Sequence, residues 1–466
     1  MTIPYDALGR ITTVRSGGEI VESYVYTNRG RTVVSNTTTA DGNPHKYTYQ
    51  KDEYGVLSSE QNRLGDTKTY NYDNEGRNKQ VTQFSNKEVF IDYDDTARTT
   101  TTRYEDGTLT VVAKDAAGRI ISAKGPTGTI SYRYDAGGKL IRQYDAKAGE
   151  ETLYKYNMSG LRTKMDSGNR EISYRYGKNG ELLAVTDNKQ RLFVTYTFDD
   201  MGREIARNYG NGVTQETRYD AIGRTVMIRE IAASRELIRA EGYIYDAQGR
   251  RSYCVDEKGN VTAFEYDAQS RLANVLYPWT VEKAASDKLE AEQAGLFFTG
   301  DKGNPDRYMI PSEDITALRN VLNLMAFSRG SILGIAQSVW KESYTYDRSG
   351  NRKTKTTPWG TITYEYDADN RMLAMGSIQY AYDKDGNLIS EKSLIKSAIY
   401  EYTDTNRMKT SVVSNTVKKT RTVSSYAYDA FGRRTLVQDA GGETMRTLYD
   451  GLRFDVIREN VTYGGI

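Results

Sequence analysis

Residues 243–250 read Tyr-Ile-Tyr-Asp-Ala-Gln-Gly-Arg, and this stretch decides the fold because versions of it recur along the chain. The shared pattern is Tyr-Asp-x-x-Gly-Arg, usually with a second aromatic residue two positions before the motif tyrosine. We count 19 copies, most of them 20 to 23 residues apart. The motif slot holds Tyr5, Tyr26, Tyr49, Tyr72, Tyr93, Lys114, Tyr134, Tyr156, Tyr176, Phe198, Tyr219, Tyr245, Tyr266, Tyr346, Tyr366, Tyr382, Tyr402, Tyr428 and Tyr449. A constant period of this length indicates a repeat architecture.

One copy of the motif predicts a β-hairpin. Tyr243 and Tyr245 are two residues apart, so they share one face of a strand. The Asp246 carboxylate is placed to accept a hydrogen bond from the backbone two residues on, which starts a turn. Gly249 stands where a type I turn followed by a left-handed residue needs no Cβ, and Arg250 begins the return strand. Single hairpins are marginal in water, so we expect many of them to stack into one antiparallel sheet.

The composition agrees with an all-β array. The chain has 38 Tyr against 10 Phe and 3 Trp, and tyrosine favours strands whose faces are only partly dry. Glycine is frequent (41) and proline rare (7), which suits tight turns with positive φ. The net charge is +2 with both signs interspersed, so the sequence predicts no nucleic-acid partner. The best apolar run, residues 331–336, is far shorter than the ~18 residues of a membrane span.

The residue types exclude several kinds of chemistry. Cys254 is the only cysteine and His45 the only histidine, so the chain forms no internal disulfide and no zinc site of the usual kind. We place His45 in a loop over 41–45 and Cys254 in a return strand as a small packed residue. The recurring aspartates are interpreted as turn chemistry, because catalysis needs one converging constellation and not a ladder. We therefore predict no catalytic, cofactor-binding or metal-binding residues, and expect the motif arginines to stack on neighbouring tyrosines.

The repeat is interrupted once, where 80 residues separate Tyr266 from Tyr346. Residues 281–296 predict a helix, 300–311 a loop with a turn at 301–305, and Ser312 the N-cap of a second helix. The predicted organisation is a first array over 1–276, a helical insertion over 277–340 and a second array over 341–466. The insertion either packs on the sheet as a decoration or plugs an opening.

The repeat resembles the YD repeat of RHS proteins, Tc-type toxin complexes and teneurins, over residues 5–276 and 341–453. The resemblance implies a β-sheet strip that spirals into a hollow shell, which in bacterial members encloses a C-terminal toxin. It also implies a core segment that often acts as an aspartyl autoprotease. The Asp-Pro-x-Gly motif of that core is absent from this sequence. Asp200, Asp383 and similar acids are therefore not assigned a catalytic role.

These observations favour a non-enzymatic scaffold, a partial shell segment that encloses or displays another polypeptide. The expected partners are the remainder of a longer RHS polypeptide or its C-terminal toxin cargo, secreted by or exposed on a bacterium. The alternative is a carbohydrate-binding or adhesive surface module whose tyrosine rows stack on sugars. We also expect the chain to be a segment of a longer protein or a truncated gene product. Strand edges at 1–25 and 450–466 would then let the isolated chain self-associate.

Overall fold

The computed structural model describes residues 2–16, 19–38, 44–168, 170–187, 189, 191–278, 281–295, 306–309, 314, 316–318, 320–321 and 336–463. These residues form an all-β protein with a small helical part, as the sequence predicts. The predicted helix over 281–296 is confirmed as α1 (Val281–Gln293), and a single 3-10 turn, η1, covers Asn28–Gly30. Residues 314, 316–318 and 320–321 are also helical. Ser312, the turn at 301–305 and residues 331–335 lie outside the described residues.

The described strands follow one another along the chain. The first part contains β1 (Thr13–Ser16), β2 (Glu19–Thr27), β3 (Thr32–Thr38), β4 (Pro44–Lys51), β5 (Leu57–Gln61), β6 (Thr67–Tyr72), β7 (Asn78–Thr82), β8 (Glu88–Asp94), β9 (Thr99–Tyr104), β10 (Leu109–Lys114), β11 (Ile120–Gly125), β12 (Gly128–Tyr134), β13 (Leu140–Asp145), β14 (Glu150–Tyr156), β15 (Arg162–Ser167), β16 (Arg170–Tyr176), β17 (Leu182–Asp187), β18 (Leu192–Phe198), β19 (Glu204–Tyr209), β20 (Thr214–Tyr219), β21 (Thr225–Ile231), β22 (Leu237–Tyr245), β23 (Arg251–Asp256), β24 (Val261–Tyr266) and β25 (Leu272–Pro278). After α1 come β26 (Asp306–Met309), β27 (Ala336–Tyr346), β28 (Arg352–Thr357), β29 (Gly360–Tyr366), β30 (Met372–Met375), β31 (Ile378–Tyr382), β32 (Leu388–Lys392), β33 (Lys396–Tyr402), β34 (Met408–Asn415), β35 (Thr420–Tyr428), β36 (Arg434–Asp439), β37 (Thr444–Tyr449) and β38 (Val456–Thr462).

The strands form one continuous antiparallel strip, in which each strand pairs with its neighbours in sequence. The exception is at the insertion, where β25 pairs directly with β27. Val339 of β27 is opposite Pro278 of β25 and also opposite Asp306 of β26, so β25 and β26 lie on opposite edges of β27. The prediction of a loop over 300–311 is therefore wrong at 306–309, where backbone pairing with β27 makes a strand.

The prediction of a loop over 41–45 is also wrong at its end. His45 belongs to β4, and its Cα is paired with that of Thr37 in β3. The β3–β4 hairpin is long, and its described strands pair as far as Thr38 and Pro44.

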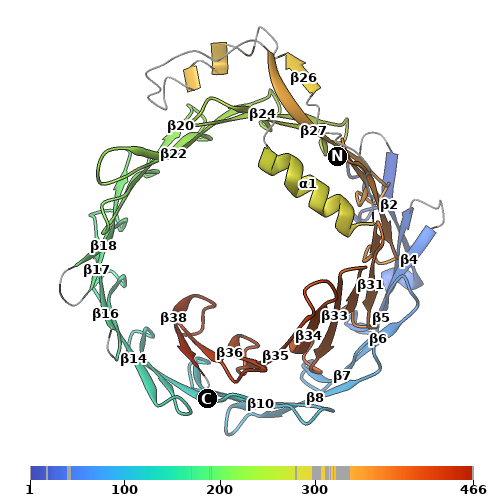
Figure 1. Ribbon diagram of the computed structural model, residues 1–466. Helices are drawn as coiled ribbons and strands as arrows, with labels where there is room; N and C mark the ends of the chain where they lie inside the picture. Colours follow the sequence, from blue (N-terminus) through green and yellow to red (C-terminus); the bar gives the residue numbers. More distant parts are fainter. Residues whose placement is uncertain are drawn as a thin grey trace.

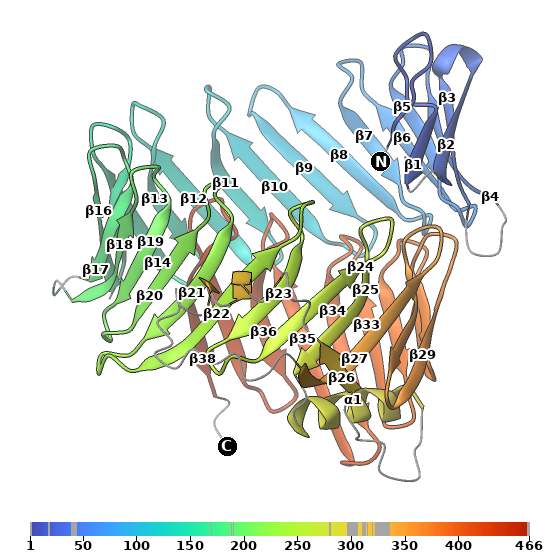
Figure 2. The ribbon, with the colours of Figure 1, turned by 90° about the horizontal axis from the view of Figure 1, so that it is seen from above.

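The strip winds into a spiral of more than one circuit. Figure 1 views it along the axis, with β2 to β25 forming a first circuit and β27 to β38 following the same path again. We call these circuits the first and second coil, and Figure 2 shows them from the side. The coils touch through residues about one circuit apart in sequence, such as Gln83 and Asp404, which are separated by 321 positions. In the described chain β1 and β38 do not pair with each other, so the sheet does not close.

A β-bulge at most of the motifs explains why the strip curves; the motif hairpins at Tyr26 and Tyr93 pair without one. Ile244 is opposite Tyr253, but Tyr245 is opposite Arg251, so Ser252 is an extra residue on the return strand. The same register shift precedes Tyr134, Tyr156, Tyr176, Phe198, Tyr219, Tyr266, Tyr346, Tyr366, Tyr382, Tyr402, Tyr428 and Tyr449. Bulges bend the strand that carries them and increase its twist. A small bend of the same kind in most repeats produces a spiral.

The insertion contacts both faces of this single-layer wall. Adjacent residues of a strand point to opposite faces, and in β27 Val339 packs in one apolar cluster while Trp340 packs in another. Leu318 and Val321, from the second helical segment, belong to the Val339 cluster, and Ala291 of α1 belongs to the Trp340 cluster. The two helical segments therefore cover opposite faces. Figure 1 draws α1 on the inside of the ring.

Replacing a turn glycine should destabilise the array through backbone strain alone. Gly249 has φ of +80°, and the nearest heavy atom to a Cβ added there is 3.9 Å away. We expect Gly249→Ala to lower the free energy of unfolding by about 1 kcal/mol, the cost of a left-handed conformation for an L-residue. Chemical denaturation measures this loss. Gly441→Ala is the control, because Gly441 has no positive φ and only ordinary contacts for a Cβ. Equal effects of both substitutions would contradict the proposed turn.

Candidate functional site: the clasp, the seam and the inner helix

Consecutive repeats are joined by a set of contacts that we call the clasp. Asp246 Oδ1 accepts hydrogen bonds from the backbone N–H groups of Gln248 (3.0 Å) and Arg250 (2.9 Å), and Oδ2 accepts one from Arg250 Nε (2.7 Å). The guanidinium carbon of Arg250 then lies 4.4 Å from the ring centre of Tyr266 in the next hairpin. The Tyr266 hydroxyl donates back to the carbonyl oxygen of Arg251 (2.8 Å). Each aspartate thus fixes an arginine, and each arginine fixes the next tyrosine.

The clasp recurs around the spiral. The same arginine-over-tyrosine stacking, at 4.1 to 5.2 Å, joins Arg10 to Tyr26, Arg77 to Tyr93, Arg119 to Tyr134, Arg203 to Tyr219, Arg224 to Tyr245, Arg271 to Tyr346, Arg371 to Tyr382 and Arg433 to Tyr449. The predicted turn geometry and the predicted stacking are both confirmed. The hydroxyl bond to the preceding repeat was not predicted, because its acceptor is a backbone carbonyl that leaves no signal in the sequence.

The clasp changes the acidity of its aspartate. Burial tends to raise the pKa of Asp246, but the backbone N–H and guanidinium of Arg250 outweigh it and hold that pKa below its usual value. At Asp199 the guanidinium of Arg203 is the largest cause of the same lowering. These carboxylates are ionised hydrogen-bond acceptors that belong to their own turns.

A second set of contacts, the seam, joins the two coils. The second coil contributes its motif turns to the seam. The first coil contributes the turns that link one hairpin to the next. The motif turns are 367–371, 383–387, 403–407, 429–433 and 450–455, and the link turns are 62–66, 83–87, 105–108, 126–127 and 146–149. Acids of the motif turns accept backbone N–H bonds from the link turns, as Asp369 does from Arg63 (3.0 Å) and Asp385 does from Ser85 (3.1 Å).

Asp404 is the most connected residue of the seam. Its carboxylate is buried and accepts bonds from Lys87 Nζ (2.6 Å) and the Asp106 N–H (2.6 Å). Its own N–H donates to the Asp106 carboxylate (3.0 Å), and its carbonyl accepts from Gln83 Nε2 (3.0 Å). Lys87 neutralises part of this paired-carboxylate charge, and the Asp404 carboxylate accordingly raises the pKa of the Lys87 ammonium.

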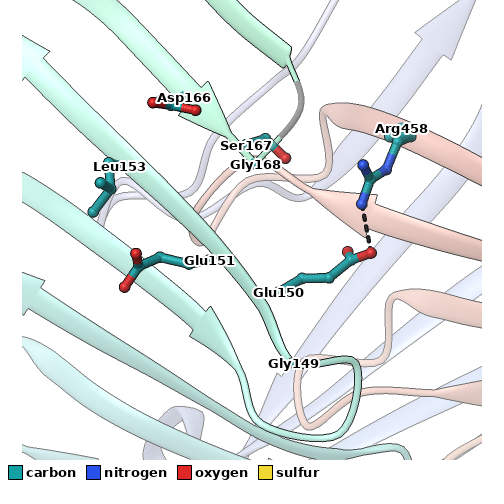
Figure 3. Close-up of a pocket in the computed structure, with 8 residues that line it drawn as sticks. All are labelled: Gly149, Glu150, Glu151, Leu153, Asp166, Ser167, Gly168 and Arg458. Atoms are coloured by element: carbon teal, nitrogen blue, oxygen red, sulfur yellow. Dashed lines mark hydrogen bonds and ion pairs between the residues drawn. The ribbon is translucent and has the colours of Figure 1, made fainter.

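Further along the seam, partly buried ion pairs join the two coils. Asp450 accepts a bond from Arg162 Nη1 (2.5 Å), and the neighbouring Gly451 N–H donates to the Tyr154 hydroxyl (3.1 Å). Burial, followed by the Asp450 charge, raises the pKa of Tyr154. The last contact is between Arg458 and Glu150 (2.5 Å). Figure 3 shows this pair at the edge of an open pocket of about 450 Å³, lined also by Gly149, Glu151, Leu153, Asp166, Ser167 and Gly168.

The helix α1 is fixed to the inner face of the wall by a buried charged cluster. Trp340 Nε1 donates to Asp287 (2.5 Å), and Lys283 bonds both Asp287 (2.8 Å) and Glu342. Lys355 bonds Glu290 on the same helix (2.6 Å). Burial raises the pKa of Asp287. Burial alone would also raise the pKa of Glu342, but bonds from Lys283 and Tyr344 lower it. Buried charges arranged in this way hold one orientation of the helix.

Comparison with known proteins places this wall in a family. A family model described as the teneurin YD-shell matches residues 129–285 and 327–453, which is more than half of the chain. The chain belongs to the teneurin YD-shell family. The family assignment confirms the resemblance seen in the sequence. A search of curated proteins finds no match.

Solved structures share the YD-shell fold at low identity. The crystal structure of TcdB2–TccC3 matches 99% of this chain at 13% identity with a TM-score of 0.52. The Photorhabdus luminescens Tc holotoxin pore matches 96% at 14% identity with a TM-score of 0.53. This YD-shell chain covers only 29% and 26% of the lengths of those two chains. It therefore corresponds to less than a third of either of them.

The other residues singled out in the sequence take separate places in the YD-shell. Cys254 lies in return strand β23, half-buried, and burial raises its pKa to about 11, so the thiol is protonated at neutral pH. Asp200 is exposed, and Asp383 accepts bonds from the Asn387 backbone (2.8 Å) and side chain (2.9 Å) of its own turn. The described residues contain no cluster of three metal-ligating side chains. They include no helix long and apolar enough to cross a membrane.

Removing the Asp404 carboxylate should open the seam. Asp404→Ala leaves Lys87 and the Asp106 N–H without their acceptor, so we expect a loss of about 2–4 kcal/mol in the free energy of unfolding. Hydrogen exchange at residues 83–87 and 105–108 should become faster. Asp200→Ala is the matched control, because Asp200 occupies the same motif position in the first coil and is exposed. Unchanged exchange at both link turns would contradict the seam.

The clasps should make the protein acid-sensitive. The pKa values of Asp6, Asp73, Asp115, Asp199, Asp220, Asp246 and Asp267 are all lowered in the folded state. Their contribution is complete above the unfolded pKa of about 3.9 and is lost as pH falls through the lower folded values. Asp287 acts in the opposite direction, because its folded pKa is raised. We expect the urea midpoint to be constant from neutral pH to about pH 5 and to fall below about pH 4. A midpoint that rises on acidification would contradict this balance.

Proposed function

We propose that this YD-shell chain is a non-catalytic segment of a hollow β-shell that encloses another polypeptide. The enclosed polypeptide would be a toxin-like cargo, in a polymorphic toxin or surface protein that is secreted by or exposed on a bacterium. The partners would be the remainder of a longer RHS polypeptide and that cargo. No nucleic acid or membrane span takes part.

The observation that carries this proposal is the seam. A second coil docks on the first through a succession of turn contacts, from Asp369 with Arg63 to Asp404 with Asp106, so the wall extends along its axis by repeating one kind of contact. The clasps set the curvature within a coil, and the seam sets the spacing between coils. A wall built in this way can be extended by adding repeats.

The non-catalytic part of the proposal rests on how the acids are used. The motif aspartates are bonded to the backbone and arginine of their own turns, and the seam acids are bonded to the facing coil. The charged cluster at α1 holds a helix to the wall through Asp287 and Glu342, both buried. The carboxylates of these three sets thus have structural partners, which leaves them poorly placed for acid–base work.

The clasp argues against the alternative function, carbohydrate binding by rows of tyrosines. A sugar-stacking platform needs an open tyrosine face, but the motif tyrosines lie beneath arginines and their hydroxyls are bonded to backbone carbonyls. A carbohydrate role would therefore need side chains outside the tyrosine ladder.

Protease protection tests enclosure. An unstructured reporter with one protease site is appended after residue 466 of the intact chain, of Asp404→Ala and of Asp200→Ala. We expect the reporter to be cut slowly on the intact and Asp200→Ala chains, and rapidly on Asp404→Ala, whose wall is opened at the seam. Equal, rapid cleavage on all three chains would show that the shell segment displays its C-terminal neighbour and does not enclose it.

A further inference from the structure

A second pocket, of about 410 Å³, lies within the seam, away from the pocket at Glu150 and Arg458. It is bounded by Tyr104, Thr108, Thr110 and Pro126 of the first coil. The second coil supplies two neighbouring hairpins, through residues 403–409 and 426–432. This volume is in the range of small-molecule sites and is large enough to hold one sugar ring. Anything bound there would contact both coils.

The pocket contains an arginine that departs from the clasp. Arg407 occupies the motif-arginine position, but the preceding aspartate position holds Thr403. Within the part of the chain that the structure describes, Arg407 forms no ion pair and does not stack over the following motif tyrosine, Tyr428. It lies against Gly432, where a Cβ would be 2.9 Å from its Nε. Lys409 also lines the pocket, is exposed, and has no ion pair among the described residues.

The one acid that lines the pocket, Asp429, does not neutralise the charges of Arg407 and Lys409. Asp429 is buried, and its Oδ2 is bonded to Arg433 Nε (2.7 Å). Its Oδ1 accepts the N–H groups of Phe431 (2.9 Å) and Arg433 (3.0 Å). Its charge is therefore neutralised inside the wall. The pocket is left with two cations and no competing carboxylate of its own.

The remaining lining combines aromatic rings with hydroxyls. Tyr104, Tyr426 and Phe431 provide apolar ring surface, while Thr108, Thr110 and Thr405 provide hydroxyl groups. This combination suits a ligand with an apolar ring face, a hydroxylated edge and one carboxylate. An arginine recognises a carboxylate through two parallel hydrogen bonds.

We propose that this pocket binds an acidic sugar, a hexuronate, whose carboxylate pairs with Arg407 and Lys409 and whose ring lies among the aromatic side chains. The threonine hydroxyls bond the sugar hydroxyls. Because the ligand contacts both coils, its binding tightens the seam. One motif tyrosine, Tyr428, also lines the pocket. The site does not depend on enclosure of a cargo.

The test compares D-glucuronate with D-glucose, which has the same ring without the carboxylate, and with acetate, which has the carboxylate without the ring. Calorimetry on the full chain should detect glucuronate and neither of the other two. Glucuronate should also slow hydrogen exchange at residues 105–108. Arg407→Gln should weaken glucuronate binding about tenfold or more, the loss expected for a charge-assisted hydrogen bond.

Arg31→Gln is the matched control, because Arg31 also occupies the motif-arginine position after a threonine, Thr27, but does not line the pocket. Both arginines are exposed, so both variants should keep the wild-type melting temperature. Lys409→Gln provides a second test if Arg407→Gln fails to fold. Absence of glucuronate binding, equal binding of glucose or acetate, or undiminished binding by Arg407→Gln and Lys409→Gln would each overturn the proposal.

Discussion

The contact between a motif arginine and the tyrosine of the following hairpin is the interaction on which the rest of this structure depends. A hairpin of about 20 residues buries too little surface to be stable alone. The aspartate closes its own turn and orients the arginine, the arginine covers the next ring, and that ring bonds back through its hydroxyl. Each clasp is local, and its repetition gives the strip one constant geometry. The bulge at the same position turns that geometry into curvature.

The seam follows from the clasps, because constant curvature brings the strip back beside itself. Residues at the same motif position then have different roles, because some of them contact the other coil and others face solvent. Asp200 and Asp404 occupy the same motif position, yet Asp200 is exposed and Asp404 is buried against Lys87 and Asp106. Arg250 is partly exposed in its clasp, whereas Arg433 is buried and also bonds the carbonyl oxygens of Gly451 and Arg453. The second coil is thus held by ordinary repeat residues placed where they have a partner.

The sequence predicted the elements well and their long-range contacts poorly. The turns, the strands and α1 follow from local signals: Asp246, Gly249 and the Ala/Glu/Lys-rich stretch after Val281. The seam could not be predicted, because Asp106 and Asp404 are 298 positions apart and their meeting depends on many small bends. His45 and β26 were missed because strand pairing, and not local propensity, decides both segments. The pocket at Arg407 gave only an indirect signal, the threonine that replaces the motif aspartate.

The two helical segments of the insertion have a mechanical consequence. Elsewhere in the described chain the wall is one sheet thick, and a ribbon of that kind bends easily about its strand axes. At β25 and β27 the sheet is sandwiched, with Trp340 packed under α1 on one face and Val339 under Leu318 on the other. Stiffness against bending rises steeply with the thickness of a plate. We therefore expect the sheet to resist bending most at β25 and β27. Changes in the curvature of the spiral should be concentrated in the uncovered hairpins on either side.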